Sequence, residues 1–379
     1  MNIGILKEDS VNEKRVALTP EGVRALVAVG QTVYVQQKAG SAALFSDEEY
    51  QQAGGVIVYS PEEVVNRSSI VLKVAPPTVD EVRLFDEGQL LVSFLHLGAS
   101  QRKILDALLE QKVTGIAYEL IESSRGDLAV LQVMSEIAGQ LSMQIAGHFL
   151  QSHEGGRGIL LGSVPGIAPA SVVILGAGTM GRTAARVALG MGAAVTVLDR
   201  DLSRLRELEY LFQWKIVTGL ANEYAVARAA RHADALIGAV LVKGEKAPYL
   251  VTEKMVKEMK AGAVIVDASI DQGGCVETSR PTTLAEPVFV RHGVVHYCVP
   301  NIPSAVPRTA SRGLTNALLP YVQTVAELGF VPALLNDIGF ARGVCTYNGF
   351  CVQPAVSKAF GLQFKDLLRT LAPSIETMN

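Results

Sequence analysis

The segment from Ser171 to Gly190 constrains the fold of this chain more than any other. The short apolar run SVVIL is followed at once by the glycine turn GAGTMG and then by the helical stretch RTAARVALG. In this context the first glycine permits a tight turn, the second lets the backbone approach a pyrophosphate, and the third allows the helix to pack closely on the strand. Backbone N–H groups at the helix start, aided by its dipole, then bind phosphates. The segment therefore predicts a dinucleotide site at Gly176, Gly178 and Gly181.

The next predicted strand, VTVLD, ends in an acidic residue, Asp199, which stands 23 residues after Gly176. A carboxylate at this place accepts hydrogen bonds from both hydroxyls of an adenosine ribose and repels a 2′-phosphate. The sequence thus favours NAD over NADP, although Arg200 follows directly and would weaken that preference.

Strands and helices alternate along most of the chain. Apolar runs at 32–36, 69–74 and 89–97 precede or follow helical stretches, and six strand-like runs follow from residue 171 onward. This alternation is typical of α/β domains with largely parallel sheets.

The order of these runs predicts two domains. We expect residues 131–303 to form a Rossmann-type, doubly wound NAD-binding domain. Residues 1–130 and 304–379 are expected to form a discontinuous α/β substrate domain, because the C-terminal part has one long helical stretch, few strand signals and too little length to fold alone.

Composition excludes several classes of protein. The 34 basic and 37 acidic side chains give a net charge of −3, which is too balanced for nucleic acid or an anionic membrane to be the default partner. Residues 158–181 form a run of 24 without an ionisable side chain, but six glycines and two prolines make it a poor membrane-spanning helix. Charged residues stand near the N-terminus, where a secretory signal would have an apolar segment. The four cysteines form no CxxC pair. We therefore expect a cytoplasmic protein without a metal site.

Eight segments spread over nearly the whole chain carry a family resemblance: NEKRVALTP, LVSFLHL, MSEIAG, GGRGILLGSVPG, GAGTMG, LIGAVLVKGEKAP, VIVDASIDQGGCVETSRPTT and YCVPNIPSAVPRTAS. They resemble the family of bacterial alanine dehydrogenases and the nicotinamide-binding subunit of proton-translocating transhydrogenase. The histidine of FLHL and the string IDQGGC are similar to the alanine dehydrogenase branch in particular. The resemblance implies reversible oxidation of L-alanine to pyruvate and ammonium with hydride transfer to NAD, by a homo-oligomer, a hexamer or a dimer.

Oxidation of an amino acid requires a cation for the carboxylate, a base for the proton and a carboxylate that stabilises the iminium. Arg15 can hold a carboxylate by two hydrogen bonds, although its charged loop alone favours a solvated arginine. His96 ends an apolar strand, where α/β folds bind ligands, although a lone histidine there is more often a core residue. Asp271 follows another strand, and Asp267 inside that strand competes with it. The resemblance implies that Arg15 binds substrate, that His96 is the catalytic acid/base and that Asp271 is the catalytic aspartate.

The chain departs from the family at the substrate lysine. Similar alanine dehydrogenases carry KVKEP after the third strand, and their second lysine binds the substrate's carboxylate or carbonyl. Here the string is KVAPP, so Ala75 stands in that lysine's place. Lys73 lies on the same strand face, about 6.6 to 6.8 Å away, and we consider it as a substitute substrate-binding residue. Without a substitute, the lost contact would cost about 2 to 5 kcal/mol, or about 30-fold to several thousand-fold in kcat/KM.

The resemblance also implies further cofactor contacts at the pyrophosphate turn, at the adenosine ribose, beside the fourth strand of the NAD-binding domain and around the nicotinamide. These positions are, in that order, Ser135, Thr179 and Met180; Arg204; Val240 and Leu241; and Ile270, Arg280, Val299 and Asn301.

Ala75 leaves three functions open. The chain can be an alanine dehydrogenase, an NAD(P)H-dependent imine or keto-acid reductase whose bulkier substrate the small Ala75 admits, or a transhydrogenase-like protein that binds NAD(H) without turnover. Retention of both His96 and Asp271 disfavours the last, because a protein that only binds the nucleotide needs neither.

Overall fold

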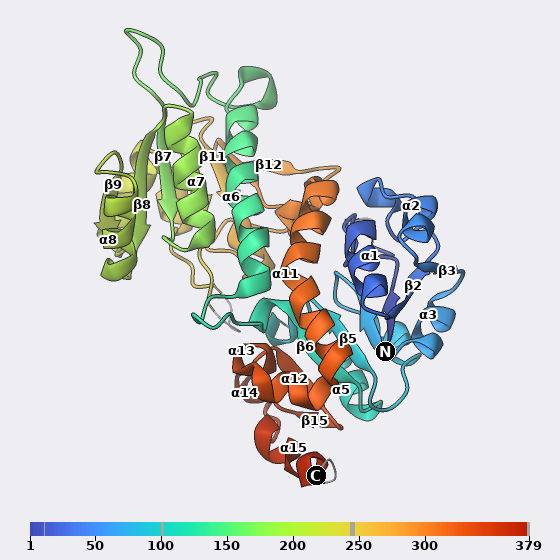
Figure 1. Ribbon diagram of the computed structural model, residues 1–379. Coiled ribbons are helices and arrows are strands. Elements are labelled where there is room, and N and C mark those ends of the chain that lie inside the picture. The colour runs from blue at the N-terminus through green and yellow to red at the C-terminus, as the bar shows by residue number, and fades with distance from the viewer. Residues whose placement is uncertain (11, 100–101, 243–246, 377–379) are drawn as a thin grey trace. The chain divides into compact units, whose positions relative to one another are not determined.

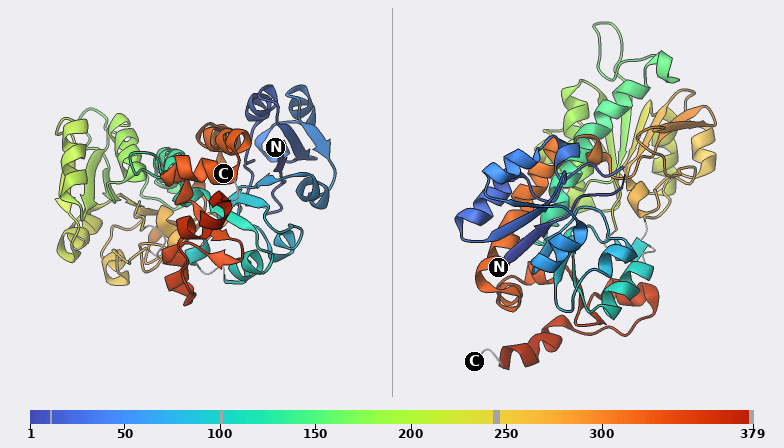
Figure 2. Two further views of the ribbon diagram at one scale, coloured as in Figure 1. Left: turned by 60° about the horizontal axis from the view of Figure 1, so that its bottom comes forward. Right: turned by 90° about the vertical axis from the view of Figure 1, so that its right-hand side faces the viewer.

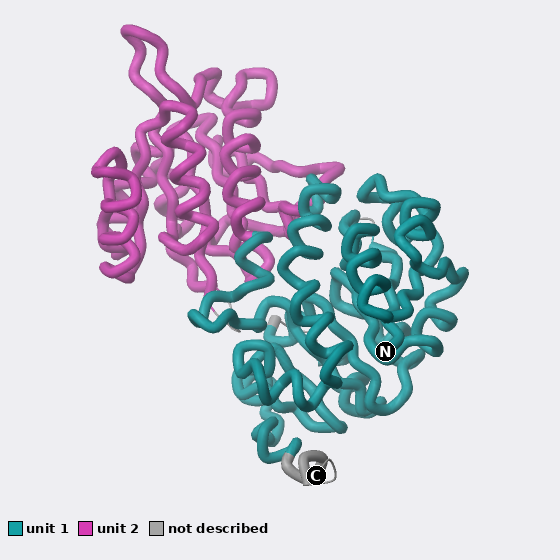
Figure 3. Tube along the Cα trace, viewed as in Figure 1, with its two compact units in different colours: residues 1–134, 304–379 teal, residues 135–303 magenta. Residues whose placement is uncertain are grey.

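The computed structural model describes residues 1–10, 12–99, 102–242 and 247–376. It divides into two compact units, shown separately coloured in Figure 3. Unit 1 comprises Met1–Met134 and Ser304–Asn379, and unit 2 comprises Ser135–Pro303. Each unit is built on its own mostly parallel sheet, so the predicted two-domain α/β fold class is confirmed.

Unit 1 contains an eight-stranded sheet in the order β15-β14-β6-β5-β4-β1-β2-β3. Its six parallel strands are β1 (Asn2–Ile5), β2 (Thr32–Gln36), β3 (Val56–Val58), β4 (Ile70–Leu72), β5 (Leu90–Ser93) and β6 (Thr114–Ala117). The strand order reverses direction between β1 and β4. In open α/β sheets such a switch point opens a crevice at the carboxyl ends of the strands, where ligands bind.

The helices of unit 1 come from both parts of its sequence. The N-terminal part contributes α1 (Pro20–Ala28), α2 (Asp47–Gln52), α3 (Pro61–Arg67), α4 (Val79–Val82) and α5 (Arg102–Glu110). The C-terminal part contributes α11 (Pro307–Leu328), α12 (Phe330–Asn336), α13 (Ile338–Ala341), α14 (Pro354–Phe360) and α15 (Leu367–Glu376). Helix α11 packs on α1, as Figures 1 and 2 show from three sides.

A hairpin near the C-terminus corrects the expectation of few strands after residue 303. Strands β14 (Val344–Tyr347) and β15 (Phe350–Cys351) extend the sheet of unit 1 antiparallel beyond β6. Their two-residue turn, Asn348–Gly349, has φ values of 48° and 77°, as the favoured hairpin turn requires. The Asn-Gly pair is a hairpin signal from which this turn could have been predicted, but we did not predict the hairpin from it, and the two strands are too short to show a pattern.

Unit 2 has the doubly wound topology that the sequence predicts. Its sheet runs in the order β12-β13-β11-β10-β7-β8-β9. The strands are β7 (Ser171–Leu175), β8 (Ala194–Asp199), β9 (Val217–Leu220), β10 (Ala235–Gly238), β11 (Val264–Asp267), β12 (Val288–Arg291) and β13 (Val294–Tyr297). Strand β12, which the alternation of strands and helices did not predict, pairs antiparallel with β13 at the edge.

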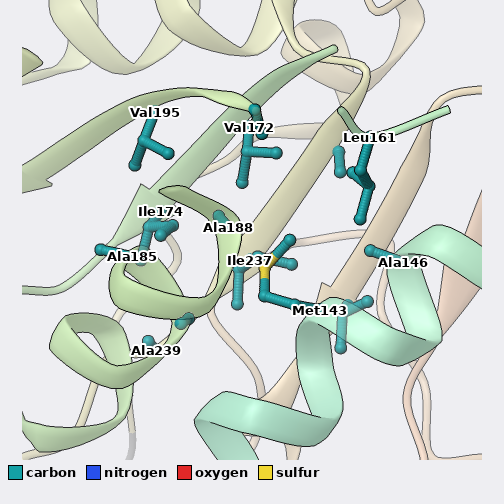
Figure 4. Close-up of a cluster of buried hydrophobic side chains, with 14 of the residues drawn as sticks. Met143, Ala146, Leu161, Val172, Ile174, Ala185, Ala188, Val195, Ile237 and Ala239 are labelled. Carbon is teal, nitrogen blue, oxygen red and sulfur yellow. The ribbon is translucent and has the colours of Figure 1, made fainter. Parts of the chain in front are cut away.

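Helices cover both faces of this sheet and explain why β7 is apolar at every position after Ser171. The helices are α6 (Ala129–Phe149), which begins in unit 1, α7 (Thr179–Gly190), α8 (Leu202–Leu211), α9 (Glu223–His232) and α10 (Glu253–Lys257). Val172 and Ile174 pack with α6 and α7 on one face, in a cluster that also contains Met143 and is drawn in Figure 4. Val173 and Leu175 pack on the opposite face with α9 and α10. Among the described residues, no helix is long and apolar enough to cross a membrane.

Candidate active site

The glycine turn of unit 2 has the geometry of a phosphate-binding turn. Gly176 has a φ of 107°, and a Cβ there would collide with the carbonyl oxygen of Ala239. A Cβ on Gly181 would collide with the carbonyl oxygen of Gly176, so only glycine lets α7 start this close to β7. Gly178 differs, because a Cβ there would have Arg204 Nη1, at 4.0 Å, as its nearest neighbour. The space over Gly178 is therefore a cradle that a larger side chain would fill, as a bound pyrophosphate requires.

Asp199 lies at the end of β8 with its carboxylate turned to this glycine turn. One oxygen accepts the N–H of Ala177 at 2.6 Å and the other accepts the N–H of Asp201 at 2.8 Å. Arg204 lies in the first turn of α8, and its Nε is 3.7 Å from Asp201. The residues at this turn fit a dinucleotide: backbone N–H groups for the phosphates and a fixed carboxylate for a ribose.

Most other predicted cofactor residues gather at the same edge of the unit 2 sheet. Val240 follows β10, and its N–H donates to Ser269 in the turn Ala268–Gln272 that contains Ile270 and Asp271. Asn301, which follows β13, donates its N–H to Asp271 Oδ1 at 2.9 Å. The positions brought to this edge are Thr179, Met180, Val240, Leu241, Ile270, Val299 and Asn301.

Two predicted positions lie apart from these strand ends. Ser135 is on α6, one turn before Gly139, where a Cβ would press against Thr183 of α7 at 2.8 Å. Arg280 stacks its guanidinium on the ring of Phe289, 4.5 Å from the centroid, which places it beside the antiparallel edge strand β12.

The two candidate aspartates differ in surroundings. Asp267 is fully buried and accepts N–H groups of Ser269, Cys275 and Val276 at 3.0 to 3.2 Å. Burial raises its pKa despite these bonds. Asp271 is exposed. Asp267 thus holds the turn after β11 together, whereas Asp271 can be reached by a ligand.

In unit 1, Arg15 is buried and already paired. Its Nε and Nη2 donate to the two oxygens of Glu13 at 2.8 and 2.6 Å, and its Nη1 points at Met134 Sδ at 3.2 Å. Its guanidinium also lies over the ring of Phe94, 5.4 Å from the centroid. Glu13 therefore occupies the Nε side of the fork, and a substrate carboxylate would have to approach from the Nη1 side.

His96 lies just past β5 in an unusual backbone conformation. Its φ is 44°, a left-handed value that non-glycine residues rarely adopt. The N–H of His96 donates to Glu119 Oε1 at 2.6 Å, and the ring nitrogen Nδ1 is 3.8 Å from the same oxygen. The imidazole stacks on Phe94 and keeps 37% of its side-chain surface exposed. Glu119 thus holds both the backbone and the ring of a histidine that solvent can reach.

Lys73, the proposed substitute for the missing lysine, is engaged inside unit 1. Its Nζ lies 2.9 Å from Glu81 and 3.3 Å from Glu8, and all three side chains are buried. Burial alone would lower the pKa of Lys73, but the two carboxylates outweigh it and raise that pKa. This pairing favours a structural role for Lys73.

Glu8 connects Lys73 with the position of the missing lysine. Its carboxylate accepts the N–H groups of Val74 and Ala75 at 2.6 and 3.2 Å. Burial raises the pKa of Glu8 to about 7, although Lys73 and these N–H groups act in the opposite direction. The methyl group of Ala75 is half-buried at this edge of the sheet.

Unpartnered polar atoms gather beside His96. Among the described residues, five buried side-chain oxygens have no hydrogen-bond partner, and three of them belong to Ser93, Tyr118 and Glu119, which end or follow β5 and β6. Four residues of this region were not identified as site residues from the sequence: Glu8, Glu13, Tyr118 and Glu119. Glu8, Tyr118 and Glu119 stand just past a parallel strand, which was a signal, because such positions line the ligand edge of the sheet.

A cavity of about 350 Å³ in unit 1 lies elsewhere. It is lined by Ser69 and Gly88, which precede β4 and β5, and by Thr114, the first residue of β6, so it lies at the amino ends of these strands. None of the predicted site residues lines this cavity, so we do not assign it to the candidate site.

Two doubly wound units, one with a glycine turn, place the chain in the class of two-domain proteins with a Rossmann-type nucleotide-binding fold. The family models for the N-terminal and C-terminal domains of alanine dehydrogenase/PNT match residues 4–138 and 142–354. The chain belongs to the alanine dehydrogenase/PNT family.

Individual relatives match this chain over nearly its full length. The chain is 46% identical to the alanine dehydrogenase of Methanococcus maripaludis, over 96% of this chain and 98% of that protein. It is 47% identical to that of Staphylococcus saprophyticus, over 97% and 99%. A solved L-alanine dehydrogenase superposes with a TM-score of 0.89 at 44% identity, covering 95% of this chain and 99% of the other. A transhydrogenase from Sinorhizobium meliloti has a TM-score of 0.78 at 24% identity over 94% and 100%, which indicates a shared fold.

Proposed function

We propose that this protein is an NAD-dependent L-alanine dehydrogenase that interconverts L-alanine with pyruvate and ammonium. The observation that supports it most is that one aromatic ring, Phe94, contacts both the Arg15 guanidinium and the His96 imidazole. A cation for a carboxylate and a group for proton transfer thus meet at one place. Relatives named alanine dehydrogenase at 44 to 47% identity support the substrate.

The proposal assigns substrate binding to unit 1. Arg15 binds the carboxylate through its Nη1 side, because Glu13 holds its other side and fixes the fork. His96 accepts a proton when the amine or the attacking water reacts, and Glu119 steadies the imidazolium that results. An imidazole suits this task because its ordinary pKa lies near neutrality.

The proposal assigns cofactor binding to unit 2. Backbone N–H groups of the turn at Gly178 would hold the pyrophosphate and Asp199 the adenosine ribose, which favours NAD over NADP. When bound, NAD supplies the hydride acceptor for the substrate's Cα–H bond. Asp271 would stabilise the positive charge on the substrate nitrogen as the iminium forms.

The experiment is a spectrophotometric assay of the purified protein. We expect NADH formation from L-alanine at alkaline pH and NADH consumption with pyruvate plus ammonium. Ala75→Lys is assayed alongside, together with a panel of bulkier amino acids and keto acids. Absence of turnover in both directions at high enzyme concentration would refute the proposal that this protein is an alanine dehydrogenase.

A second candidate follows from Ala75. Where similar enzymes carry a substrate-binding lysine, the methyl group leaves room for a larger substrate and removes one cation. This second candidate is an imine or keto-acid reductase with a larger substrate. It would be favoured if only the Ala75→Lys variant gained a large kcat/KM for alanine while the wild type turned over a bulkier imine or keto acid.

We also propose that the protein is a cytoplasmic homo-oligomer that acts on small molecules. Family resemblance supports a hexamer or a dimer. Light scattering of the purified protein would measure the mass, and a monomer at micromolar concentration would contradict this.

A further inference from the structure

Tyr118 is a buried phenol for which the fold provides no hydrogen-bond partner. Its side chain is fully buried directly after β6, and no described protein atom bonds its hydroxyl. Burying a hydroxyl without a partner destabilises a fold, so phenylalanine would be the more stable residue here. The other fully buried tyrosine, Tyr50, donates its hydroxyl to the carbonyl oxygen of Leu18 at 2.8 Å. The hydroxyl of Tyr118 therefore indicates a partner outside the chain.

The position of Tyr118 connects it with the substrate-binding groups. Its ring meets Phe94 edge-on, with 5.1 Å between ring centroids, and the guanidinium of Arg15 also lies over the Phe94 ring, 5.4 Å from its centroid. Arg15 and Glu8 both lie within Coulombic reach of the phenol. Tyr118 thus shares one aromatic contact with the two residues, Arg15 and His96, to which we assign substrate chemistry.

The charge environment defines what the hydroxyl can do. Burial, and next the carboxylate of Glu8, raise the pKa of Tyr118 well above its ordinary value, and Arg15 only partly offsets this. The phenol consequently keeps its proton throughout the neutral and alkaline range and acts as a hydrogen-bond donor. Beside an arginine, a neutral donor suits a carboxylate or keto oxygen, which accepts from both.

The missing lysine supplies the reason for a second donor. Ala75 follows β4, Phe94 and His96 follow β5, and Tyr118 follows β6, so the three strand ends are consecutive in the sheet. A lysine at position 75 would donate to the substrate from the β4 side. Among the described residues that contact the Phe94 ring, Arg15, His96 and Tyr118 carry hydrogen-bond donors, and the phenol of Tyr118 lies on the β6 side.

We propose that Tyr118 donates its phenolic hydrogen to the carboxylate or keto oxygen of the substrate, beside Arg15, and so takes over the task of the family's lysine. This rests on the proposed function. Both groups are shielded from bulk water, since Arg15 is 4% exposed and Tyr118 is fully buried.

The test compares two conservative variants, Tyr118→Phe and Tyr50→Phe. Because the Tyr118 hydroxyl makes no internal hydrogen bond, its removal leaves the Tm unchanged or raised, while the dissociation constant of pyruvate from the enzyme–NADH complex rises about 10- to 100-fold. KM for L-alanine rises similarly, with kcat within a few-fold, as for lost uniform binding. Tyr50→Phe does the reverse: it lowers the Tm and leaves pyruvate binding unchanged.

A rescue experiment separates substrate contact from altered packing. Adding Ala75→Lys to Tyr118→Phe should restore pyruvate binding to within a few-fold of wild type, because a second donor returns to the site. Calorimetry of pyruvate binding does not depend on turnover. If the wild type binds pyruvate tightly but does not turn over alanine, the proposed function is refuted and the role of Tyr118 in binding stands. If the dissociation constant of pyruvate from Tyr118→Phe lies within twofold of the wild-type value, the role of Tyr118 is overturned. Absence of pyruvate binding by the wild type would overturn both.

Discussion

At the scale of single residues, unit 1 contains a buried charged group that the sequence did not reveal. Glu8 and Glu81 enclose Lys73, and Glu8 also accepts two backbone N–H groups next to Ala75. The strand pattern predicted the place of Lys73 but not its partners, because these depend on β4 lying beside β1 in the sheet. For the same reason the contact between His96 and Glu119 needed the pairing of β5 with β6.

We predict that Lys73→Met destabilises the protein. Removing the ammonium leaves two buried carboxylates without a counter-charge, which costs about 3 to 5 kcal/mol in the free energy of unfolding. Urea denaturation measures this. Lys112→Met serves as the control, because Lys112 forms an exposed pair with Glu87 that is worth less than about 1 kcal/mol. Unchanged stability together with a raised KM for alanine would instead make Lys73 the substrate residue.

Glu8 predicts a pH dependence of stability. Its folded-state pKa of about 7 lies above the ordinary value of 4.5, so between these values the folded state binds the proton more tightly than the unfolded state. The contribution is full below pH 4.5 and is lost as the pH rises through 7. We expect the free energy of unfolding of wild type to fall relative to Glu8→Gln between pH 5 and 8, measured by urea denaturation. A constant difference across this range would contradict the raised pKa of Glu8.

At the scale of elements, the segment from β7 through α7 was fully predictable. An apolar strand, a glycine turn and a helix are all local patterns, and Gly176 and Gly181 occupy positions where a Cβ would collide with backbone. Strands β12 and β15 were not predicted, since four or two residues at an edge carry too little hydrophobic pattern. Their pairing is decided by the rest of the sheet.

We predict that a substitution in the glycine turn weakens NADH binding without destabilising the protein. Gly178→Ala should weaken NADH binding about tenfold or more, because the methyl group enters the space of the pyrophosphate. Its φ of −70° suits alanine, so stability should change by less than about 1 kcal/mol. Fluorescence titration with NADH measures the first and thermal unfolding the second. Gly190→Ala, at the far end of α7 with nothing within 4 Å of the added Cβ, is the matched control. Equal NADH affinity in both variants would place the phosphates elsewhere.

At the scale of the whole molecule, family membership and site chemistry point to the same reaction. The residues to which we assign the proposed reaction lie at the carboxyl edge of each sheet: Arg15 and His96 in unit 1, and Gly178, Asp199 and Asp271 in unit 2. The switch point between β1 and β4 depends on the order of strands in the sheet, which local sequence patterns do not encode. The residues that follow each strand, in contrast, can be identified from the sequence.

We propose that His96 and Asp271 carry out the NAD-dependent oxidation of L-alanine. The most direct test is the initial rate of NADH formation from L-alanine, measured for wild type, His96→Asn and Asp271→Asn together with the dissociation constant of NADH. We expect one pyruvate per NADH in wild type, a loss of rate of about 100-fold or more in each variant, and NADH affinity within a few-fold of wild type in both variants. Near-wild-type rates in either variant would contradict this proposal.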